Sequence, residues 1–242
     1  MTTKPIPQQS ERKNDEHGHE EAVRGMFDRI APTYDRANRV MSMGIDTLWR
    51  KKAINLLEGV PDGALLDSCA GTMDLTALLA QRFPGRRLVA MDFAGEMLDR
   101  GKEKAPAAER VLADATKMPF TDEEFAGSIC GFGMRNLGDT EKGARDMFRV
   151  LKSGGIFVTL EFFRPVTAKS RFFHAAYARA VLPTAGGLLS GDRAAYAYLA
   201  ASMKGFLSRN EYQELLEKTG FEIVEGFDLL FGIASIVCAK KK

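Results

Sequence analysis

From residue 64 onward, short apolar runs alternate with helical patterns, and this alternation constrains the fold more than any other feature of the chain. In order, the predicted elements are strand 64–69, helix 73–83, strand 87–92, helix 95–104, strands 109–113 and 126–131, helix 140–151 and strand 155–162. Strands joined by crossover helices form parallel sheets with helices on both faces. We therefore expect an α/β fold with an open, doubly wound sheet and a ligand site beyond the carboxyl ends of its strands.

The N-terminal region has a different character. Residues 1–20 are polar and charged, with too little apolar surface to offset the entropy of ordering, so we expect a disordered tail. Helical patterns follow at 21–31 and 46–58, with a predicted loop at 32–38 between them. We treat 21–242 as a single domain, because a chain of 242 residues with 45% apolar content can bury one substantial core.

An insertion rich in Phe, Tyr, Ala and Leu occupies residues 164–206. Apolar helices placed over the carboxyl ends of a sheet suit a lid above an apolar substrate cavity, and ordinary helix packing is the alternative. An amphipathic helix is predicted at 210–219, followed by a terminal pair of strands at 221–228 and 231–239. The turn Leu151–Gly155 is expected to end one helix and start the fifth strand.

Composition excludes several classes of protein. The 34 basic and 32 acidic residues give a net charge of +2 without a basic stripe, so no nucleic-acid partner is expected. The three cysteines lie far apart in apolar runs, which favours reduced packing thiols in a reducing compartment. The two histidines of the tail lack a further ligand nearby, so no metal is predicted. No secretory leader and no apolar run near ~18 residues is present, which predicts a cytoplasmic protein, at most peripheral to a membrane.

The candidate ligand site lies where two predicted strands end. The strand 64–69 leads into a loop of small residues, and the next strand ends in Asp92. Small residues allow backbone N–H groups to approach a ligand, and a carboxylate at the tip of the neighbouring strand can accept hydrogen bonds from a ribose. This arrangement is typical of a nucleotide-type cofactor site.

Other enzyme classes fit the chain poorly. The predicted domain has one histidine, His174, and no Gly-x-Ser-x-Gly motif, which disfavours a serine hydrolase. A phosphate-binding loop with a Lys-Ser/Thr pair is absent, as is the three-glycine dinucleotide motif. A cofactor with a ribose and no phosphates fits better.

The motifs of the whole chain resemble those of class I S-adenosylmethionine-dependent methyltransferases, and most closely the C-methyltransferases of menaquinone and ubiquinone biosynthesis. The resemblance covers nearly everything from residue 22 to the end. It rests on Met26–Asp35, Asn38, Trp49-Arg50, Asp67 with Gly71-Thr72 and Asp74-Leu75, Asp92, Asp114-Ala115, Gly131–Asn136, Glu161-Phe162, Tyr196–Leu199 and Gly232–Ala234.

The resemblance implies a Rossmann-like sheet of about seven strands with an antiparallel last strand, and S-adenosylmethionine as methyl donor. It implies that Asp92 binds the ribose, that Gly71 and Thr72 pass the amino-acid part, and that Asp114 and Ala115 border the adenine. Further cofactor contacts are expected from Asp67, Phe93 and Gly131, with the structural alternative that Phe93 is a core residue.

The implied reaction is C-methylation of a reduced, prenylated quinol ring. Arg135 stays protonated and is expected to hold a phenolate oxygen, to which Asn136 donates a hydrogen bond; a salt bridge at the strand end is the alternative for Arg135. Tyr34 is a candidate catalytic residue, and Asp35, His174, Tyr196 and a water are further candidates for the base.

Two residues depart from the family loop Gly-Gly-Thr-Gly-Asp, because Ala70 and Met73 replace glycines. Met73 places a flexible side chain beside the expected methionine part of the cofactor, unless that side chain points away. A methyltransferase for a soluble phenolic metabolite and a non-catalytic cofactor-binding assembly subunit therefore stay in view. Contact of Lys169, Arg171 and Arg179 with anionic headgroups, and a homodimer, are also left open.

Overall fold

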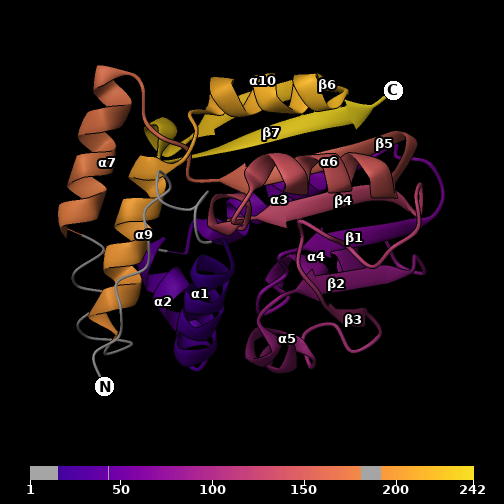
Figure 1. The fold of residues 1–242 in the computed structure, drawn as a ribbon, viewed down its shortest axis with the longest axis horizontal. Coiled ribbons are helices and arrows are strands. Elements are labelled where there is room, and N and C mark those ends of the chain that lie inside the picture. The colour runs from indigo at the N-terminus through magenta and orange to yellow at the C-terminus, as the bar shows by residue number, and fades with distance from the viewer. Residues whose placement is uncertain (1–15, 43, 181–191) are drawn as a thin grey trace.

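The computed structural model describes residues 16–42, 44–180 and 192–242, which form a seven-stranded sheet flanked by helices (Figure 1). The strand order is β3-β2-β1-β4-β5-β7-β6, and only β7 runs antiparallel to its neighbours within this described part. The predicted doubly wound sheet with an antiparallel last strand is confirmed. The strands are β1 Ala64–Ser68, β2 Leu88–Asp92, β3 Glu109–Leu112, β4 Phe125–Gly131, β5 Leu151–Glu161, β6 Phe221–Leu229 and β7 Ala234–Lys241.

The central strand β1 defines the switch point of the sheet. It pairs in parallel with β2 on one side and with β4 on the other, so that Asp67 lies opposite both Ala90 and Ile129. All five residues of β1 and of β2 are buried, as expected for parallel strands covered on both faces. The loops after β1, β2 and β4 therefore meet at one edge of the sheet, where ligands of such folds bind.

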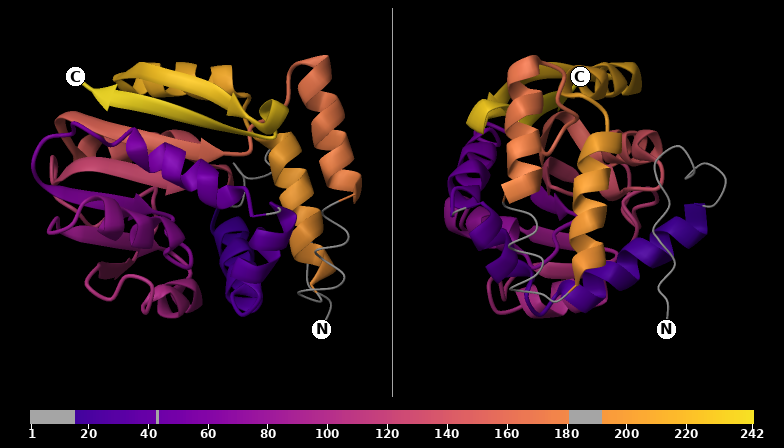
Figure 2. Two further views of the ribbon diagram at one scale, coloured as in Figure 1. Left: turned by 180° about the vertical axis from the view of Figure 1, so that it is seen from behind. Right: turned by 90° about the vertical axis from the view of Figure 1, so that its left-hand side faces the viewer.

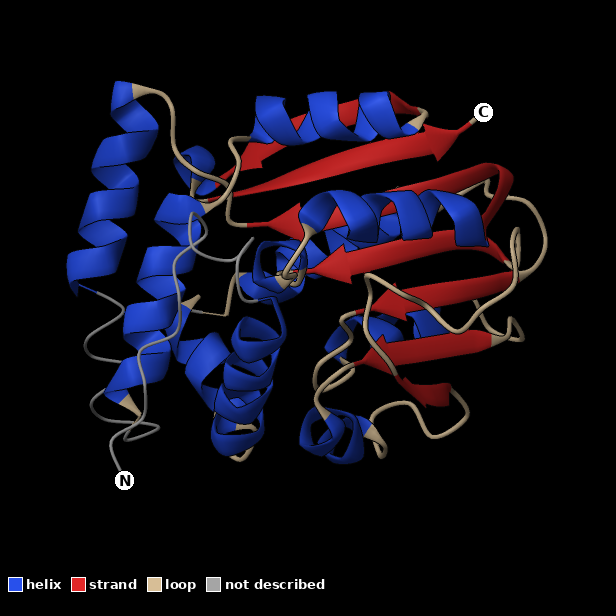
Figure 3. Cartoon of the chain, viewed as in Figure 1, coloured by secondary structure: helices blue, strands red, loops and turns tan. Residues whose placement is uncertain are grey.

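Two hydrophobic layers hold helices against the two faces (Figure 3). Helices α6 (Thr140–Val150) and α10 (Arg209–Thr219) pack on one face over a cluster that includes Phe157, Met147 and Tyr212. Helices α3 (Asp46–Asn55) and α4 (Asp74–Arg82) cover the other face over Leu65 and Leu79. Helix α5 (Gly95–Gly101) packs on β2.

The starts of two of these helices are capped by side chains. An Asp139 carboxylate oxygen accepts hydrogen bonds from the backbone N–H groups of Glu141 and Lys142, at 2.9 and 3.0 Å. Ser208 and Glu211 form a reciprocal capping box at the start of α10. Such caps contribute about 1 kcal/mol each and end the preceding loops at defined residues.

Four helices gather at the carboxyl ends of the parallel strands (Figure 2). They are α1 (Glu16–Ile30), α2 (Tyr34–Met41), α7 (Ala168–Ala180) and α9 (Arg193–Gly205). Helices α7 and α9 come from the predicted insertion and stand in front of this edge of the sheet in the right-hand view of Figure 2. None of the helices in the described ranges is long and apolar enough to cross a membrane.

Three predicted boundaries differ from the structure. Helix α1 begins at Glu16, so residues 16–20 are helical and not part of a disordered tail; residues 1–15 lie outside the described residues. The predicted loop 32–38 contains the start of α2, because Ala37 and Met41, four residues apart, bury one helical face against α7 and α9.

The third difference concerns the predicted turn at Leu151–Gly155. Strand β5 already begins at Leu151, which pairs with Phe125, and Gly154 with φ of 77° lies within the strand. The register shifts between Phe125 and Gly127, so the glycines form an irregularity in the strand and not a separate turn. Residues 181–191 of the predicted insertion lie outside the described residues.

Candidate active site

A first cavity of about 640 Å³ opens at the carboxyl ends of β1, β2 and β4. Three loops that are far apart in the sequence meet there, as the strand order requires. Six of the predicted cofactor residues line it: Gly71, Asp92, Phe93, Asp114, Ala115 and Gly131.

Asp92 fixes the shape of this cavity. One of its carboxylate oxygens accepts the backbone N–H of Gly71 at 2.8 Å, and the other accepts that of Ala94 at 2.9 Å. The Asp92 side chain thus joins the loop after β1 to the loop after β2. Burial raises its pKa to about 6, and the backbone hydrogen bonds oppose this rise because they stabilise the carboxylate.

The loop residue Met73 points away from the cavity. Its backbone has φ of 62° and ψ of 27°, the left-handed conformation that glycine adopts most easily. Its side chain is fully buried among Ala90, Leu98 and Ala105 and packs against Gly101 of α5, where a Cβ atom would come within 2.7 Å of it. The Met73 side chain therefore forms core and leaves the cavity open.

Two predicted cofactor residues, Asp67 and Thr72, lie outside the lining of the cavity. Asp67 is fully buried behind the loop and accepts the Thr76 hydroxyl at 2.6 Å, and burial raises its pKa to about 7. Thr72 donates its hydroxyl to Asp35 of α2 at 2.5 Å. Both side chains form their hydrogen bonds away from the cavity lining, so their contact with a cofactor stays a prediction.

A second cavity of about 740 Å³ lies between the N-terminal helices and the helices of the insertion. Its lining is largely apolar, from α1, α2, α7 and α9, with Arg50 and Arg135 as its cations. Three residues line both cavities: Phe27, Tyr34 and Phe132. The two spaces are therefore neighbours that share a wall of three aromatic side chains.

Arg135 lies in the second cavity and also forms a buried ion pair. Its guanidinium donates to the Glu161 carboxylate at 2.6 Å, and its backbone N–H donates to the same group at 3.2 Å. Glu161 is fully buried and Arg135 is 6% exposed. The charge of Glu161 holds the pKa of Arg135 above its usual value, against the effect of burial, so the guanidinium stays charged. Arg135 thus forms the salt bridge expected as the alternative and also lines the second cavity, and its contact with a phenolate stays a prediction.

Asn136 and Tyr34 occupy the border between the cavities. The Asn136 amide donates to the carbonyl of Phe132 at 3.1 Å, and its oxygen accepts the Tyr198 hydroxyl at 3.1 Å. Removal from water raises the pKa of the Tyr34 phenol, and the nearby Arg50 and Arg135 charges oppose that rise. The predicted catalytic residues Arg135, Asn136 and Tyr34 are thus brought together.

The other candidates for the base lie elsewhere. Asp35 is paired with Lys104 at 2.6 Å, and the His174 Nε2 atom is hydrogen-bonded to the carbonyl of Gly232 at 2.8 Å. Neither residue lines either cavity, and burial lowers the pKa of His174. The side chain of Tyr196 lies outside the described residues.

Glu20 and Arg50 are two of the cavity residues to which the sequence assigned no role. Glu20, in the predicted tail, lines the first cavity. Arg50 of α3 lines the second, with its guanidinium 5.8 Å from the centre of the Phe132 ring. Arg50 belongs to a motif shared with the family, which marked the residue without indicating its chemistry.

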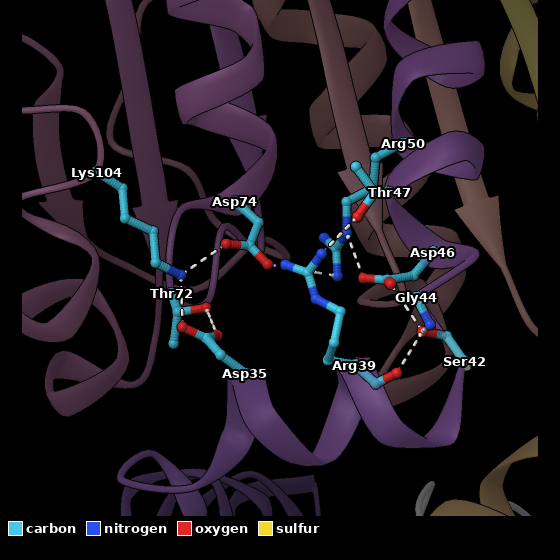
Figure 4. Close-up of polar contacts among 10 residues, drawn as sticks. All are labelled: Asp35, Arg39, Ser42, Gly44, Asp46, Thr47, Arg50, Thr72, Asp74 and Lys104. Carbon is cyan, nitrogen blue, oxygen red and sulfur yellow. Dashed lines mark hydrogen bonds and ion pairs between the residues drawn. The ribbon is translucent and has the colours of Figure 1, made fainter.

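A polar network ties the cavities together (Figure 4). Arg50 pairs with Asp46 at 3.3 Å and with Asp74 at 3.8 Å. Asp74 binds Lys104 at 2.6 Å, and Lys104 binds Asp35, the partner of Thr72. This chain of charges connects the loop of the first cavity to helices α2 and α3, which wall the second.

Comparisons with known proteins agree with this arrangement. A protein from Geotalea daltonii described as "Ubiquinone/menaquinone biosynthesis C-methyltransferase UbiE" is 38% identical over 228 residues, 91% of this chain and 97% of its own. A "Demethylmenaquinone methyltransferase" from Bacteroides fragilis is 36% identical over 227 residues, 91% of this chain and 93% of its own.

Among solved structures, an S-adenosylmethionine-dependent methyltransferase from Thermotoga maritima superposes with a TM-score of 0.64 at 16% identity, covering 90% of this chain and 99% of its own. That likeness confirms the fold. The model of the ubiE/COQ5 methyltransferase family matches residues 14–241. The chain therefore belongs to the ubiE/COQ5 methyltransferase family.

Proposed function

We propose that this protein transfers the methyl group of S-adenosylmethionine to a ring carbon of a prenylated quinol in menaquinone or ubiquinone biosynthesis. Membership of the family and the names of its curated relatives support the reaction class. The observation that carries the proposal is the common aromatic wall of the two cavities, Phe27, Tyr34 and Phe132. The two cavities meet at these side chains, so a donor in the first cavity and an acceptor in the second would approach each other there.

The first cavity suits the methyl donor. S-adenosylmethionine supplies an electrophilic methyl group on a sulfonium. The Asp92 carboxylate retains lone pairs beyond its two backbone contacts and can accept ribose hydroxyls. Asp114, which lines the same cavity, supplies an acceptor for the adenine amino group. Phe93 and Phe132 line this cavity, and aromatic rings tolerate a nearby cation. Because the Met73 side chain is buried in the core and points away from the cavity, it does not block the site.

The second cavity suits the acceptor ring. A quinol carbon becomes nucleophilic when the neighbouring hydroxyl loses its proton, and a phenolate needs a nearby positive charge. Arg135 stays charged and adjoins Tyr34, so we assign it to the phenolate oxygen. Arg50, which also lines this cavity, supplies a second cation for the other ring oxygen. Asn136 lines the donor cavity and adjoins Arg135 in sequence, so it orients the acceptor from the side of the sulfonium.

The apolar part of the second cavity suits a prenyl tail. Helix α1 contributes Met26 and Ile30, and helix α9 contributes Ala195 and Leu199. Helices α7 and α9 act as the lid predicted for residues 164–206. Because a prenylated quinol resides in a bilayer, the protein collects it at a membrane surface.

The experiment compares acceptors that share a ring and differ in the tail. Methyl transfer is measured with short-chain prenylated quinols and with soluble phenols of equal ring structure. A kcat/KM at least tenfold higher for the prenylated acceptor supports the proposal, since each buried CH₂ of the tail contributes ~0.8 kcal/mol. Equal or better turnover of the soluble phenol supports the alternative metabolite enzyme. Donor binding without any turnover supports the assembly subunit.

A further inference from the structure

Two large aromatic side chains project into solvent near the second cavity. Phe172 of α7 is 68% exposed, and Phe231, in the short 3-10 helix η4 (Leu230–Gly232), is 54% exposed. Both rings contact Phe173, at centroid distances of 5.6 and 4.5 Å. With the partly exposed Leu230, they form a continuous apolar patch on the outer end of the molecule. Exposed aromatic patches of this kind mark interaction sites.

The backbone holds η4 in an unfavourable conformation that keeps this patch exposed. Leu230 and Phe231 have φ of 41° and 58°, values that L-residues rarely adopt. Phe231 gains little burial from this conformation, because its side chain remains 54% exposed. The His174 Nε2 atom is hydrogen-bonded to the carbonyl of Gly232 at 2.8 Å, which fixes η4 to helix α7. The two elements therefore form one surface, which we call the α7–η4 face: Lys169, Arg171, Phe172, Leu230 and Phe231.

The charged residues of helix α7 beside the patch are all basic, whereas Asp228, next to η4, is paired with Arg209. Helix α7 carries Lys169, Arg171 and Arg179 and no acidic residue, and all three basic side chains are exposed. Within the described part of the chain, none of them lies within ion-pair distance of a carboxylate. The Lys169 ammonium lies 4.8 Å from the centre of the Phe231 ring, so cation and aromatic face the same region. Exposed aromatic side chains flanked by basic residues on one helix are typical of proteins that bind the interface of an anionic bilayer.

The α7–η4 face also adjoins the acceptor cavity. Phe173 lies beneath the exposed rings, and Tyr177, one helical turn later, lines the second cavity and approaches Phe162 at 6.4 Å between ring centroids. Phe162 in turn stacks on Phe132 of the shared wall at 4.5 Å. A row of aromatic side chains thus leads from the exposed patch to the reacting centre.

We propose that the α7–η4 face docks the protein on an anionic lipid bilayer, with Phe172 and Phe231 inserted at the headgroup level and Lys169 and Arg171 on acidic headgroups. The inference rests on the proposed function, since a prenylated acceptor must leave the bilayer near the cavity. A second copy of the chain is a poorer occupant, because a symmetric contact would bring two basic helices together.

The test is co-sedimentation of the full chain with vesicles of phosphatidylcholine, with and without phosphatidylglycerol. We expect binding to the anionic vesicles that weakens with salt. Lys169→Gln with Arg171→Gln should reduce the partition coefficient by about thirtyfold, since each basic residue near the surface contributes about 1 kcal/mol. Phe172→Ser with Phe231→Ser should reduce binding to a similar degree and leave the salt dependence unchanged.

Matched controls lie on other parts of the surface. Leu112→Ser removes a 66% exposed apolar side chain from the opposite edge of the sheet, and Arg100→Gln with Lys102→Gln removes two charges from the α5 region. These variants should bind vesicles as the wild type does. Equal loss in the controls, or no binding of the wild type to anionic vesicles, overturns the proposal. A dimer in sedimentation velocity that the Phe172 and Phe231 variants abolish, without vesicle binding, assigns the face to a second copy and also overturns it.

Activity on a tail-less quinol in solution separates this inference from the proposed function. Variants of the α7–η4 face should retain that activity and lose turnover of a long-chain quinol embedded in vesicles. A wild type that binds vesicles but transfers no methyl group to either acceptor contradicts the proposed function alone. Equal turnover of the embedded quinol by wild type and face variants contradicts the docking inference alone.

Discussion

Replacing Met73 by glycine tests whether this departure from the family loop belongs to the core or to the donor cavity. The wild-type side chain is fully buried, and truncation of a buried methionine costs about 2–5 kcal/mol. Its φ of 62° is unfavourable for an L-residue by about 1–2 kcal/mol, which glycine does not incur. The difference predicts that Met73→Gly lowers the free energy of unfolding by roughly 2 kcal/mol, which corresponds to a fall in Tm of about 4–8 °C for a chain of this size.

Met73→Ala separates the two contributions, because alanine loses the packing and keeps the backbone strain. We expect the free energy of unfolding to decrease in the order wild type, Met73→Gly, Met73→Ala, with about 1 kcal/mol between the two variants. Urea unfolding measures stability, and calorimetric titration measures the affinity for S-adenosylmethionine.

The donor affinity of Met73→Gly should stay within about twofold of the wild type, since the side chain points away from the cavity. Tenfold tighter donor binding by Met73→Gly, with unchanged stability, would show that the methionine reaches into the cavity. Equal stability of the glycine and alanine variants would refute the argument from strain.

Three further predictions concern charged groups. Glu161→Gln leaves the buried Arg135 charge without its carboxylate and should lower the free energy of unfolding by roughly 3 kcal/mol in urea titrations; an unchanged midpoint would contradict the ion pair. The ribose contact proposed for Asp92 requires its ionised carboxylate, and burial raises the pKa of this group to about 6. The affinity for the donor should therefore be constant above that pH and fall about tenfold per pH unit below it. A donor affinity that does not change between pH 5 and 8 would count against this role. Arg50→Met should lower kcat/KM for a quinol by about tenfold or more and lower kcat/KM for a monophenol of the same ring much less. As a control, Lys51→Met, which changes an exposed residue of the same helix, should affect neither acceptor. Equal losses of kcat/KM for both acceptors would show that Arg50 has a structural role alone.

The sheet could be predicted from the sequence because its buried parallel strands are nearly continuous apolar runs, separated by helices with a clear period. Helix α2 was missed because its local signals, a proline at 32 and polar residues up to Asn38, indicate a loop. Its helical form depends on the packing of Ala37 and Met41 against α7 and α9, which lie more than 130 residues away. The helix propensity of residues 32–41 carries no information about that distant contact.

The candidate site shows the same division between local and distant information. Strand ends located Asp92, Asp114 and Gly131 correctly at the first cavity, because the topology of a doubly wound sheet determines where strand tips meet. The motif could not show that Asp67, unlike these residues, lies outside the lining of the cavity. Its side chain points behind the loop to Thr76, because side chains alternate between the two faces of a strand. The network that brings Arg50 to the acceptor cavity is formed by residues from four segments, and no periodicity links them.

The fate of a ¹³C-labelled methyl group of S-adenosylmethionine tests the proposed function most directly. The protein is incubated with short-chain demethylmenaquinol and with a demethylated benzoquinol, each kept reduced or oxidised, and the label is located by NMR and mass spectrometry. We expect a methyl group on a ring carbon and transfer to a reduced acceptor only, because the proposed nucleophile is a quinol carbon beside a phenolate held by Arg135. A methyl group on oxygen, or equal transfer to the oxidised quinone, would contradict the proposed function.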